Sequence, residues 1–486
     1  MRQLKGKAVR SGVAKLLGQL ATTGIRLLYL AVLARLLNAS DFGLVAMVTV
    51  VTGFLERFTH AGLSSATIQK AEISDQQISQ LFWVNLLVGL FLAVTCVSLA
   101  PFVARFYDDP RLRLIMIVMA SGFVFAALGV QHSALLERDL RYGALSAIDA
   151  ISQFASAVLG ICLALAGWSY WALVAASISS PGIYTLSCWI ASGWIPKRPR
   201  SGVEVRPMLS FGGTLMLNSV VVYAGYNMEK IVLGRFWGAD ALGIYTRASQ
   251  LVSIPVTSIN AMIGGVFFSV LSRLQDDPAQ FRSCFLKGYS IILAFSIPST
   301  LFCAFFADDI ILLALGPNWS SAIPVFRLMT PTILVLAIIN PTYWLLVSTG
   351  RQKRSLYLGL VLSPWVILAT TLGLPYGPNG VAFSYSAAMV LWLFPSIVWG
   401  LHGTPISIRA LVNASCGPFI ASIAAVVCAF AITHYLGPDL SSLARLLLGG
   451  TAMTVTYGWI SLFLIEERSL YRSVLASLRM PFKLSA

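Results

Sequence analysis

Long apolar segments follow one another along almost the whole sequence, and this feature most limits what the chain can fold into. Each segment is about as long as the roughly 20 apolar residues that a helix needs to cross a bilayer. Hydrophobic residues make up 57% of the 486 residues and charged residues only 11%, against about 25% charged in a typical soluble protein. So few charges cannot cover the surface of a water-soluble protein of this size. The sequence therefore predicts an all-α polytopic membrane protein.

Fourteen candidate membrane spans can be counted along the chain. They lie near residues 12–36, 43–64, 79–104, 112–136, 142–166, 168–193, 208–233, 242–271, 282–306, 322–348, 355–373, 379–401, 409–434 and 442–465. A polar, proline-broken stretch separates the sixth span from the seventh. We therefore expect a six-helix lobe at 1–193, a linker at 194–207, a second six-helix lobe at 208–403, and a helix pair with a basic tail at 404–486.

The positions of the basic residues orient these spans. If the N-terminus lies inside, 21 Lys and Arg residues fall in inner connections and tails, and only six fall in outer connections. Cytoplasmic loops of membrane proteins carry such an excess, so both termini are predicted to be cytoplasmic. No connection is longer than about 20 residues. We therefore expect no extramembrane domain that could house catalysis.

The termini and the cysteines narrow the class of protein further. The basic N-terminus runs into an apolar stretch without a small-residue cleavage site, which favours an uncleaved first span. All seven cysteines lie in apolar segments and none forms a CxxC pair. Metal binding and a disulfide framework are therefore not expected. No GxSxG, HExxH, Walker A or GxGxxG context occurs, so we predict no catalytic residue, no metal and no cofactor.

An internal repeat joins two distant segments without a gap. Residues Ala34 to Val45, ARLLNASDFGLV, align with residues Gly234 to Tyr245, GRFWGADALGIY, at an offset of 200 residues. The first segment joins spans 1 and 2, and the second joins spans 7 and 8. Because the offset covers an even number of spans, both copies keep the same orientation. Parallel repeats of this kind occur in transporters whose substrate site lies between the two halves.

Seven basic residues fall within the predicted spans. They are Lys15, Arg26, Arg57, Lys230, Arg247, Lys287 and Arg327. A basic residue at a helix centre costs roughly 2.5–3.5 kcal/mol on insertion scales, so it normally faces a cavity or a partner. Three of the seven, Lys15, Lys287 and Arg327, lie close enough to span ends to reach the interface with their long side chains. The other four lie on spans 1, 2, 7 and 8, which are the spans that the repeat relates.

We therefore predict that Arg26, Arg57, Lys230 and Arg247 bind the substrate, although snorkelling remains an equal alternative for Lys230 and Arg247. Three acids, Glu56, Glu229 and Asp149, are candidates for ion coupling or charge pairing. Two of these acids directly precede a basic residue, and adjacent helix positions point about 100° apart, so neither pair is automatically an ion pair. The set keeps an excess of positive charge, which favours an anionic substrate such as a pyrophosphate head group.

Several runs in the sequence resemble one family of transporters. They are ARLLNASDFGLVAMV (34–48), GLSSATIQK (62–70), ERDLRY (137–142), GRFWGADALGIYTRASQL (234–251), LGPNWSSAIPVFRLM (315–329) and GPNGVAFSYS (377–386). In this order, they resemble the Wzx-type polysaccharide and lipopolysaccharide flippases of the multidrug/oligosaccharidyl-lipid/polysaccharide exporter (MOP) superfamily. The runs are spread over most of the chain.

The resemblance implies two pseudo-symmetric six-helix lobes and a final helix pair around a central cationic cavity. It also implies that the chain flips an undecaprenyl-pyrophosphate-linked oligosaccharide across the bacterial inner membrane by alternating access, for exopolysaccharide or lipopolysaccharide synthesis. Membrane lipids and the polysaccharide polymerase machinery would be its partners, and no nucleic acid would be. Coupling to an H⁺ or Na⁺ gradient is a family-level property that the sequence leaves open.

Three other functions remain as alternatives. A lipid II flippase would have the same fold, and its anionic substrate would also require basic residues within the spans. A small-molecule exporter of the multidrug (MATE) type would also fit the fold, but a cationic cavity would repel cationic drugs. A membrane glycosyltransferase or polymerase is less compatible with the sequence, because such enzymes usually need a sizeable outer loop that carries catalytic groups.

Overall fold

A computed structural model describes residues 2–59, 73–199, 227–260, 264–436 and 440–463, together with Thr67, Tyr223 and Gly225. All regular secondary structure in these residues is helical. Within the same ranges, nine helical segments are long and apolar enough to cross a membrane, which confirms an all-helical, multi-span membrane protein. The count of fourteen spans stays a prediction. Residues 200–207 of the expected linker, most of the seventh span before Met228 and the basic tail lie outside the described residues.

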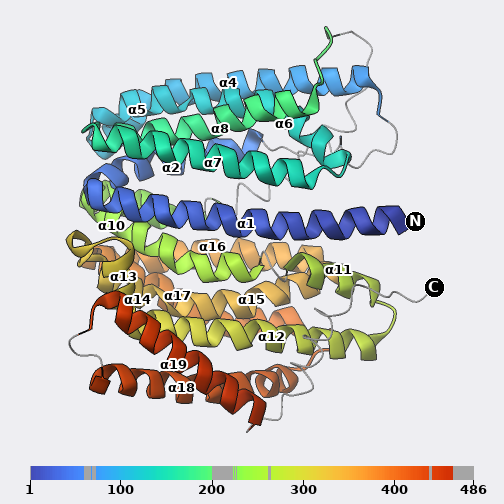
Figure 1. Cartoon of the computed structure of the whole chain (residues 1–486), viewed down its shortest axis with the longest axis vertical. Coiled ribbons are helices and arrows are strands. Elements are labelled where there is room, and N and C mark those ends of the chain that lie inside the picture. The colour runs from blue at the N-terminus through green and yellow to red at the C-terminus, as the bar shows by residue number, and fades with distance from the viewer. Residues whose placement is uncertain are drawn as a thin grey trace. The chain divides into compact units, whose positions relative to one another are not determined.

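The helices form two compact units, of which the first comprises residues 1–246 and 314–318. Its helices are α1 (Arg2–Leu36), α2 (Ala39–Thr59), α4 (Asp75–Tyr107), α5 (Arg111–Met119), α6 (Ser121–Arg138), α7 (Tyr142–Leu165), α8 (Tyr170–Ser192) and the first part of α10 (Met228–Ile259). The blue-to-green helices α4, α6, α7 and α8 run alongside one another in Figure 1. Helix α1 packs along α7, and α7 packs along α8.

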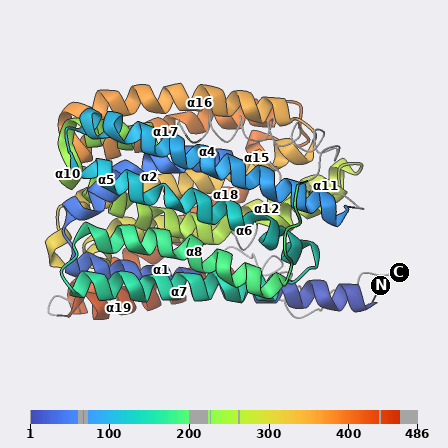
Figure 2. The ribbon, with the colours of Figure 1, turned by 90° about the horizontal axis from the view of Figure 1, so that it is seen from above.

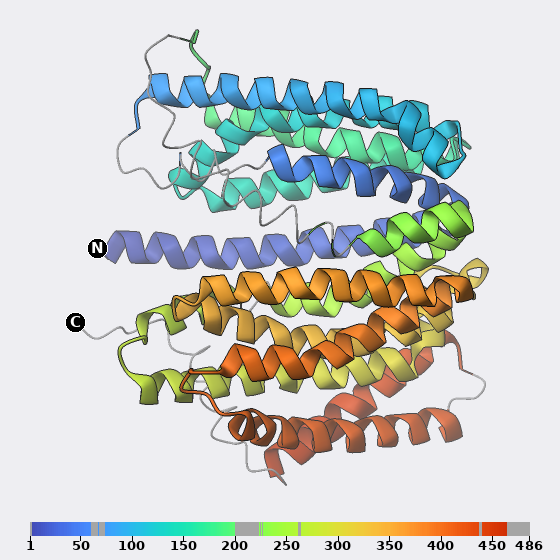
Figure 3. The ribbon, with the colours of Figure 1, turned by 180° about the vertical axis from the view of Figure 1, so that it is seen from behind.

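The second unit comprises residues 247–313 and 319–486. Besides the rest of α10, it contains α11 (Gly265–Arg273), α12 (Pro278–Phe305), most of α13 (Ala307–Ala314), α14 (Ala322–Met329), α15 (Pro331–Ser348), α16 (Gln352–Gly373), α17 (Gly377–Leu401), α18 (Ile408–Leu436) and α19 (Ser442–Phe463). Its main apolar core forms around α12, where Phe281, Phe285 and Tyr289 repeat at helical spacing and are almost fully buried. Figure 3 shows the orange helices α16 and α17 side by side.

Special backbone conformations end the helices of the first unit. The turn between α7 and α8 contains Gly167 and Ser169, both with positive φ, at the break that the sequence places between residues 166 and 168. Helix α4 begins with a capping box in which Ser74 and Gln77 satisfy each other's backbone amide groups. It ends at Tyr107, and the next residue, Asp108, adopts the left-handed conformation that Asp tolerates better than most residues.

The two repeat segments have the same local structure. Helix α1 ends at Leu36 and α2 begins at Ala39, and in the second copy the backbone leaves helical geometry at Gly238 (φ 77°, ψ −173°) inside α10. The sequence predicts a longer break there, from residue 234 to residue 241. The structure needs only one non-helical residue, because glycine reaches positive φ at no steric cost.

The two copies also touch each other reciprocally. A Cβ atom built on Gly43 would overlap the carbonyl oxygen of Ala239, and one built on Gly243 would overlap the carbonyl oxygen of Ala39. Each copy therefore contributes an Ala and a Gly four residues apart, the spacing that lets two membrane helices approach with their backbones in contact. These contacts lie within the first unit.

The described part of the expected linker is attached to α4. The Trp194 indole N–H donates to Asp75 Oδ1 (2.6 Å), and Lys197 Nζ forms an ion pair with Asp75 Oδ2 (2.5 Å). The backbone N–H of Lys197 donates to Ser79, and its carbonyl accepts from the indole of Trp83. The linker therefore leaves the first unit along a fixed path as far as Lys197.

Candidate functional site

Two of the predicted basic residues belong to one connected set of side chains in the first unit. The Arg57 guanidinium lies 4.9 Å from the centre of the Tyr223 ring, within cation–π distance. The Asn227 side-chain amide donates to the Tyr223 carbonyl (2.9 Å), and Lys230 Nζ donates to Asn227 Oδ1 (2.8 Å). Cations from the predicted spans 2 and 7 are thereby linked through one aromatic residue and one amide residue.

Tyr223 holds this set of residues against α2. Its hydroxyl donates to the carbonyl oxygen of Val50 (3.1 Å), and its ring lies 6.5 Å from the ring of Phe54. The hydroxyl occupies the place where a residue larger than Gly53 would put its Cβ atom. Arg57 itself is exposed. Tyr223 is therefore fixed by its packing against α2, while the Arg57 guanidinium remains accessible to a ligand.

Arg26 lies in α1 beside a separate pocket of about 210 Å³ between α1, α7 and α8. The three helices are adjacent in both Figure 1 and Figure 2. Polar side chains make up much of the lining: Arg26 and Tyr29 from α1, Gln153 and Ser156 from α7, and Ser177 and Ser180 from α8. Within the described part of the chain, Arg26 makes no ion pair or hydrogen bond, and no contact joins it to Tyr223 or Lys230.

The pocket lies half-way along α7. Gln153 is eleven residues from the start of α7 and twelve from its end, which corresponds to about 17 Å on either side at 1.5 Å per residue. Arg26 lies ten residues before the end of α1, at Leu36, which is about 15 Å. The hydrocarbon core of a bilayer is about 30 Å thick, so helices of this length place the pocket near the membrane midplane.

The three predicted acidic residues have different surroundings. Glu56 is exposed beside Arg57, Asp149 is half-buried in α7, and Glu229 is buried at the start of α10. Glu229 Oε2 has no hydrogen-bond partner among the described residues. None of the ion pairs in the described part of the chain joins these acids to Arg26, Arg57 or Lys230.

Arg247, the fourth predicted basic residue, belongs to the second unit. It is half-buried in α10, and its Nη1 donates to Gln250 Oε1 (2.6 Å), one turn further along the helix. Its proposed role in substrate binding rests on the repeat and on the sequence alone.

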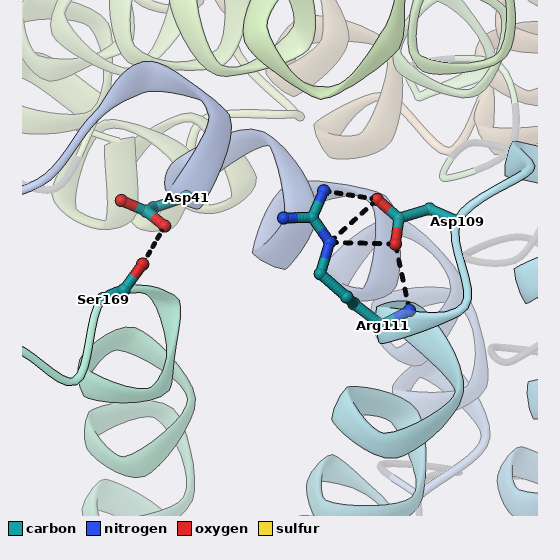
Figure 4. Close-up of polar contacts among 4 residues, drawn as sticks. All are labelled: Asp41, Asp109, Arg111 and Ser169. Carbon is teal, nitrogen blue, oxygen red and sulfur yellow. Dashed lines mark hydrogen bonds and ion pairs between the residues drawn. The ribbon is translucent and has the colours of Figure 1, made fainter.

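A second polar cluster fixes the ends of α2, α5 and α8 (Figure 4). Asp41, in the first turn of α2, accepts from the backbone N–H of Asn38 and from the Ser169 hydroxyl, which holds Ser169 at its positive φ. Nearby, Arg111 binds both carboxylate oxygens of Asp109, with Nη2 2.7 Å from Oδ2. These hydrogen bonds from Arg111 hold the pKa of Asp109 below its usual range.

Sequence reasoning missed several of these residues. Tyr223 is not recognisable, because a tyrosine in an apolar span normally indicates packing or an interfacial anchor. Gln153 had a usable signal: it follows Asp149 by four residues and precedes Ser156 by three, so all three lie on one face of α7. A polar stripe of this kind within a predicted span indicates a face that does not contact lipid.

A family of known proteins matches this chain. The model of the family described as "Polysaccharide biosynthesis protein" matches residues 32–324, which is well over half of the sequence and includes α1 from Val32 onward, α2, α7, α8 and α10. The chain belongs to this family. The match confirms the resemblance to Wzx-type exporters that the sequence runs indicate.

Individual curated relatives show a similar relationship. The lipopolysaccharide biosynthesis protein WzxC of Escherichia coli K12 is 25% identical over 359 residues, which cover 72% of each chain. The succinoglycan biosynthesis transport protein ExoT of Rhizobium meliloti is 24% identical over 473 residues, which cover 94% of this chain and 93% of ExoT. The similarity to ExoT therefore extends over nearly the full length of both proteins.

Solved structures identify the fold. The lipid II flippase MurJ in its inward closed conformation matches with a TM-score of 0.74 at 15% identity, covering 95% of this chain and 100% of MurJ. An inward-facing multidrug resistance MATE transporter of the MOP superfamily matches with a TM-score of 0.61 at 16% identity, covering 83% and 96%. This member of the polysaccharide biosynthesis family thus has the fold of MOP superfamily transporters.

Proposed function

We propose that this protein flips an undecaprenyl-pyrophosphate-linked oligosaccharide from the inner to the outer leaflet of the bacterial inner membrane. The substrate would serve exopolysaccharide or lipopolysaccharide synthesis, and the protein would move it by alternating access without a chemical step. The family match and the transporter fold support this proposal. The names of relatives such as ExoT, a biosynthesis transport protein, point the same way.

The linkage of Arg57 to Lys230 through Tyr223 and Asn227 is the observation that carries the proposal. Two cations, one on the predicted span 2 and one on the predicted span 7, are linked through Tyr223 and Asn227 within one unit, and no described acid neutralises them by an ion pair. Such a set of cations favours an anionic ligand, such as a pyrophosphate. Arg26 near the midplane supplies a further positive charge on the same unit.

The direct test is export by a double variant, Arg26→Gln with Arg57→Gln, in a strain whose own copy of the gene is deleted. Each charge-assisted contact is worth about 1.5–3 kcal/mol, so loss of both should reduce polymer export by about a hundredfold or more. Immunoblots of isolated membranes would establish that the variant reaches the membrane at normal levels.

A matched control removes two other cations from predicted spans. Lys287 and Arg327 lie near span ends, and Arg327 is paired with Asp308 at 2.5 Å, so the double variant Lys287→Gln with Arg327→Gln should keep most of the export. Normal export by the Arg26 and Arg57 double variant would contradict the proposed site. Equal losses of export in both double variants would show that export depends on the total positive charge of the spans and not on this site.

A further inference from the structure

Five of the six basic residues that the sequence predicts in outer connections belong to the first unit. They are Arg35, Arg105, Arg111, Arg113 and Arg235. Basic residues are disfavoured in such connections, so their concentration at one end of one unit needs a physical reason. Arg111 is bound to Asp109. Arg105 and Arg113 are exposed, and their guanidinium groups make no ion pair or hydrogen bond with other described residues.

A second stretch of the internal repeat shows that the fold does not require these two arginines. Residues 102–109, FVARFYDD, align with residues 302–309, FCAFFADD, at the same offset of 200 residues. At this offset, Arg105 corresponds to Phe305 and Arg113 to Leu313, which are 45% and 38% exposed. All four positions are helical. The second unit therefore has apolar side chains where the first unit has exposed cations, and a role in binding explains the arginines better than a role in folding.

The two arginines lie at the same depth, next to apolar side chains that face the lipid. Arg105 is two residues before the end of α4, and Arg113 is two residues after the start of α5, which is about 3 Å from the helix end in each case. Helices α4 and α5 pack against each other, and packed helices lie about 8–10 Å apart, so both side chains come within reach of one ligand. One turn deeper, on the same helix faces, lie the exposed Phe102 and Ile117.

Arg235 adds a third cation at this end of the first unit. Its guanidinium lies 5.8 Å from the centre of the Phe106 ring, within cation–π distance, and Phe106 directly follows Arg105 in α4. Two exposed acids, Asp108 and Asp240, belong to the same end of the unit, and the three arginines outnumber them. Cations at the helix ends with apolar side chains one turn deeper match a ligand that has a phosphate above acyl chains.

We propose that Arg105, Arg113 and Arg235 bind the head group of an anionic phospholipid, of the phosphatidylglycerol type, in the leaflet that meets this end of the first unit. The phosphate accepts charge-assisted hydrogen bonds from Arg105 and Arg113, and the acyl chains lie against Phe102 and Ile117. Arg235 adds electrostatic attraction from α10. The site shares no residue with the Arg57–Lys230 set, so this inference does not depend on the proposed function.

The test uses purified full-length protein in detergent and measures the dissociation constants of phosphatidylglycerol and of zwitterionic phosphatidylcholine by native mass spectrometry. The wild type should bind phosphatidylglycerol about tenfold more tightly than phosphatidylcholine. The double variant Arg105→Gln with Arg113→Gln should bind phosphatidylglycerol about tenfold more weakly than the wild type, because two basic residues near the phosphate are lost. The double variant Arg105→Lys with Arg113→Lys keeps both charges and should retain most of the affinity.

A matched control removes two exposed arginines from the second unit, Arg273→Gln with Arg282→Gln, and should change the affinity for phosphatidylglycerol less than twofold. An equal loss in this control would overturn the inference, because binding would then follow the total charge. A wild type that binds both lipids equally would overturn it, as would a glutamine double variant at 105 and 113 that binds phosphatidylglycerol like the wild type. If that variant lost affinity for undecaprenyl pyrophosphate but not for phosphatidylglycerol, the set would bind the transported lipid and the inference would be wrong.

Discussion

At the scale of single residues, the ion pair between Asp109 and Arg111 gives a pH-dependent prediction. The hydrogen bonds from Arg111 lower the pKa of Asp109 in the folded protein, so the pair contributes stability above the unfolded pKa of about 3.9. This contribution is lost as the pH falls through the lower folded value. The side chain of Arg111 is 51% exposed, so solvent screening limits the contribution to about 1 kcal/mol or less.

The variant Asp109→Asn should therefore unfold at a slightly lower temperature than the wild type at pH 7 in detergent. The difference should shrink as the pH is lowered below about 4, because the unfolded wild type then binds a proton at Asp109 that the folded protein binds only at a lower pH. Asp139→Asn is the matched control, since Asp139 is exposed at the end of α6 and makes no ion pair with described residues. A difference that stays constant down to pH 3 would contradict this assignment.

The residues of the candidate site were only partly predictable at this scale. Arg57 and Lys230 stand out in the sequence, because a charge within an apolar span is costly and therefore rare. Tyr223, which links them, does not stand out, because its role depends on which residues α2 brings opposite it. Gln153 and Ser180 line the same pocket only because α7 and α8 pack side by side. The amino-acid sequence alone does not predict such contacts between residues of different helices.

At the scale of helices, the reciprocal contact between the two repeat segments predicts the effect of added bulk. Replacing Gly43 or Gly243 by Val would force the backbones of α2 and α10 apart, because the new Cβ atom overlaps a carbonyl oxygen that cannot rotate away. Overpacking of this kind typically costs about 1–3 kcal/mol. Both variants should lower the unfolding temperature in detergent and reduce polymer export.

Gly24→Val is the control for this prediction. Gly24 lies within α1, and a Cβ atom built on it meets nothing within 4 Å. It should leave the stability unchanged or raise it slightly, because valine has a somewhat higher helix propensity than glycine. If Gly43→Val and Gly243→Val were as stable and as active as Gly24→Val, the close crossing of the two repeats would be wrong.

The repeat also shows which features of the helices the sequence predicts and which it does not. The match at an offset of 200 residues locates both turns, and the structure puts non-helical backbone at equivalent positions of the two copies, Leu37–Asn38 and Gly238. The sequence does not reveal that the copies contact each other, since alignment compares residues without placing them in space. Nor does it reveal that Trp194 and Lys197 attach the linker to α4, because polar, proline-containing stretches usually indicate an exposed connection.

At the scale of the whole molecule, hydropathy and charge predict the class of protein well. An apolar chain in a bilayer must satisfy its backbone hydrogen bonds internally, so the long apolar segments form helices. The exact number of spans and the boundaries of the lobes remain predictions. Hydropathy does not decide whether a turn such as the one at Gly238 separates two spans or bends one helix.

Translocation by purified protein tests the central claim most directly. Full-length protein is reconstituted into liposomes that contain an undecaprenyl-pyrophosphate-linked saccharide, and the rate at which the lipid becomes accessible to a non-permeant reagent is measured. We expect the wild type to exceed protein-free liposomes by tenfold or more, and the Arg26→Gln, Arg57→Gln double variant to fall close to the protein-free rate. A double variant that translocates the lipid at the wild-type rate would contradict the account, as would a wild type no faster than protein-free liposomes.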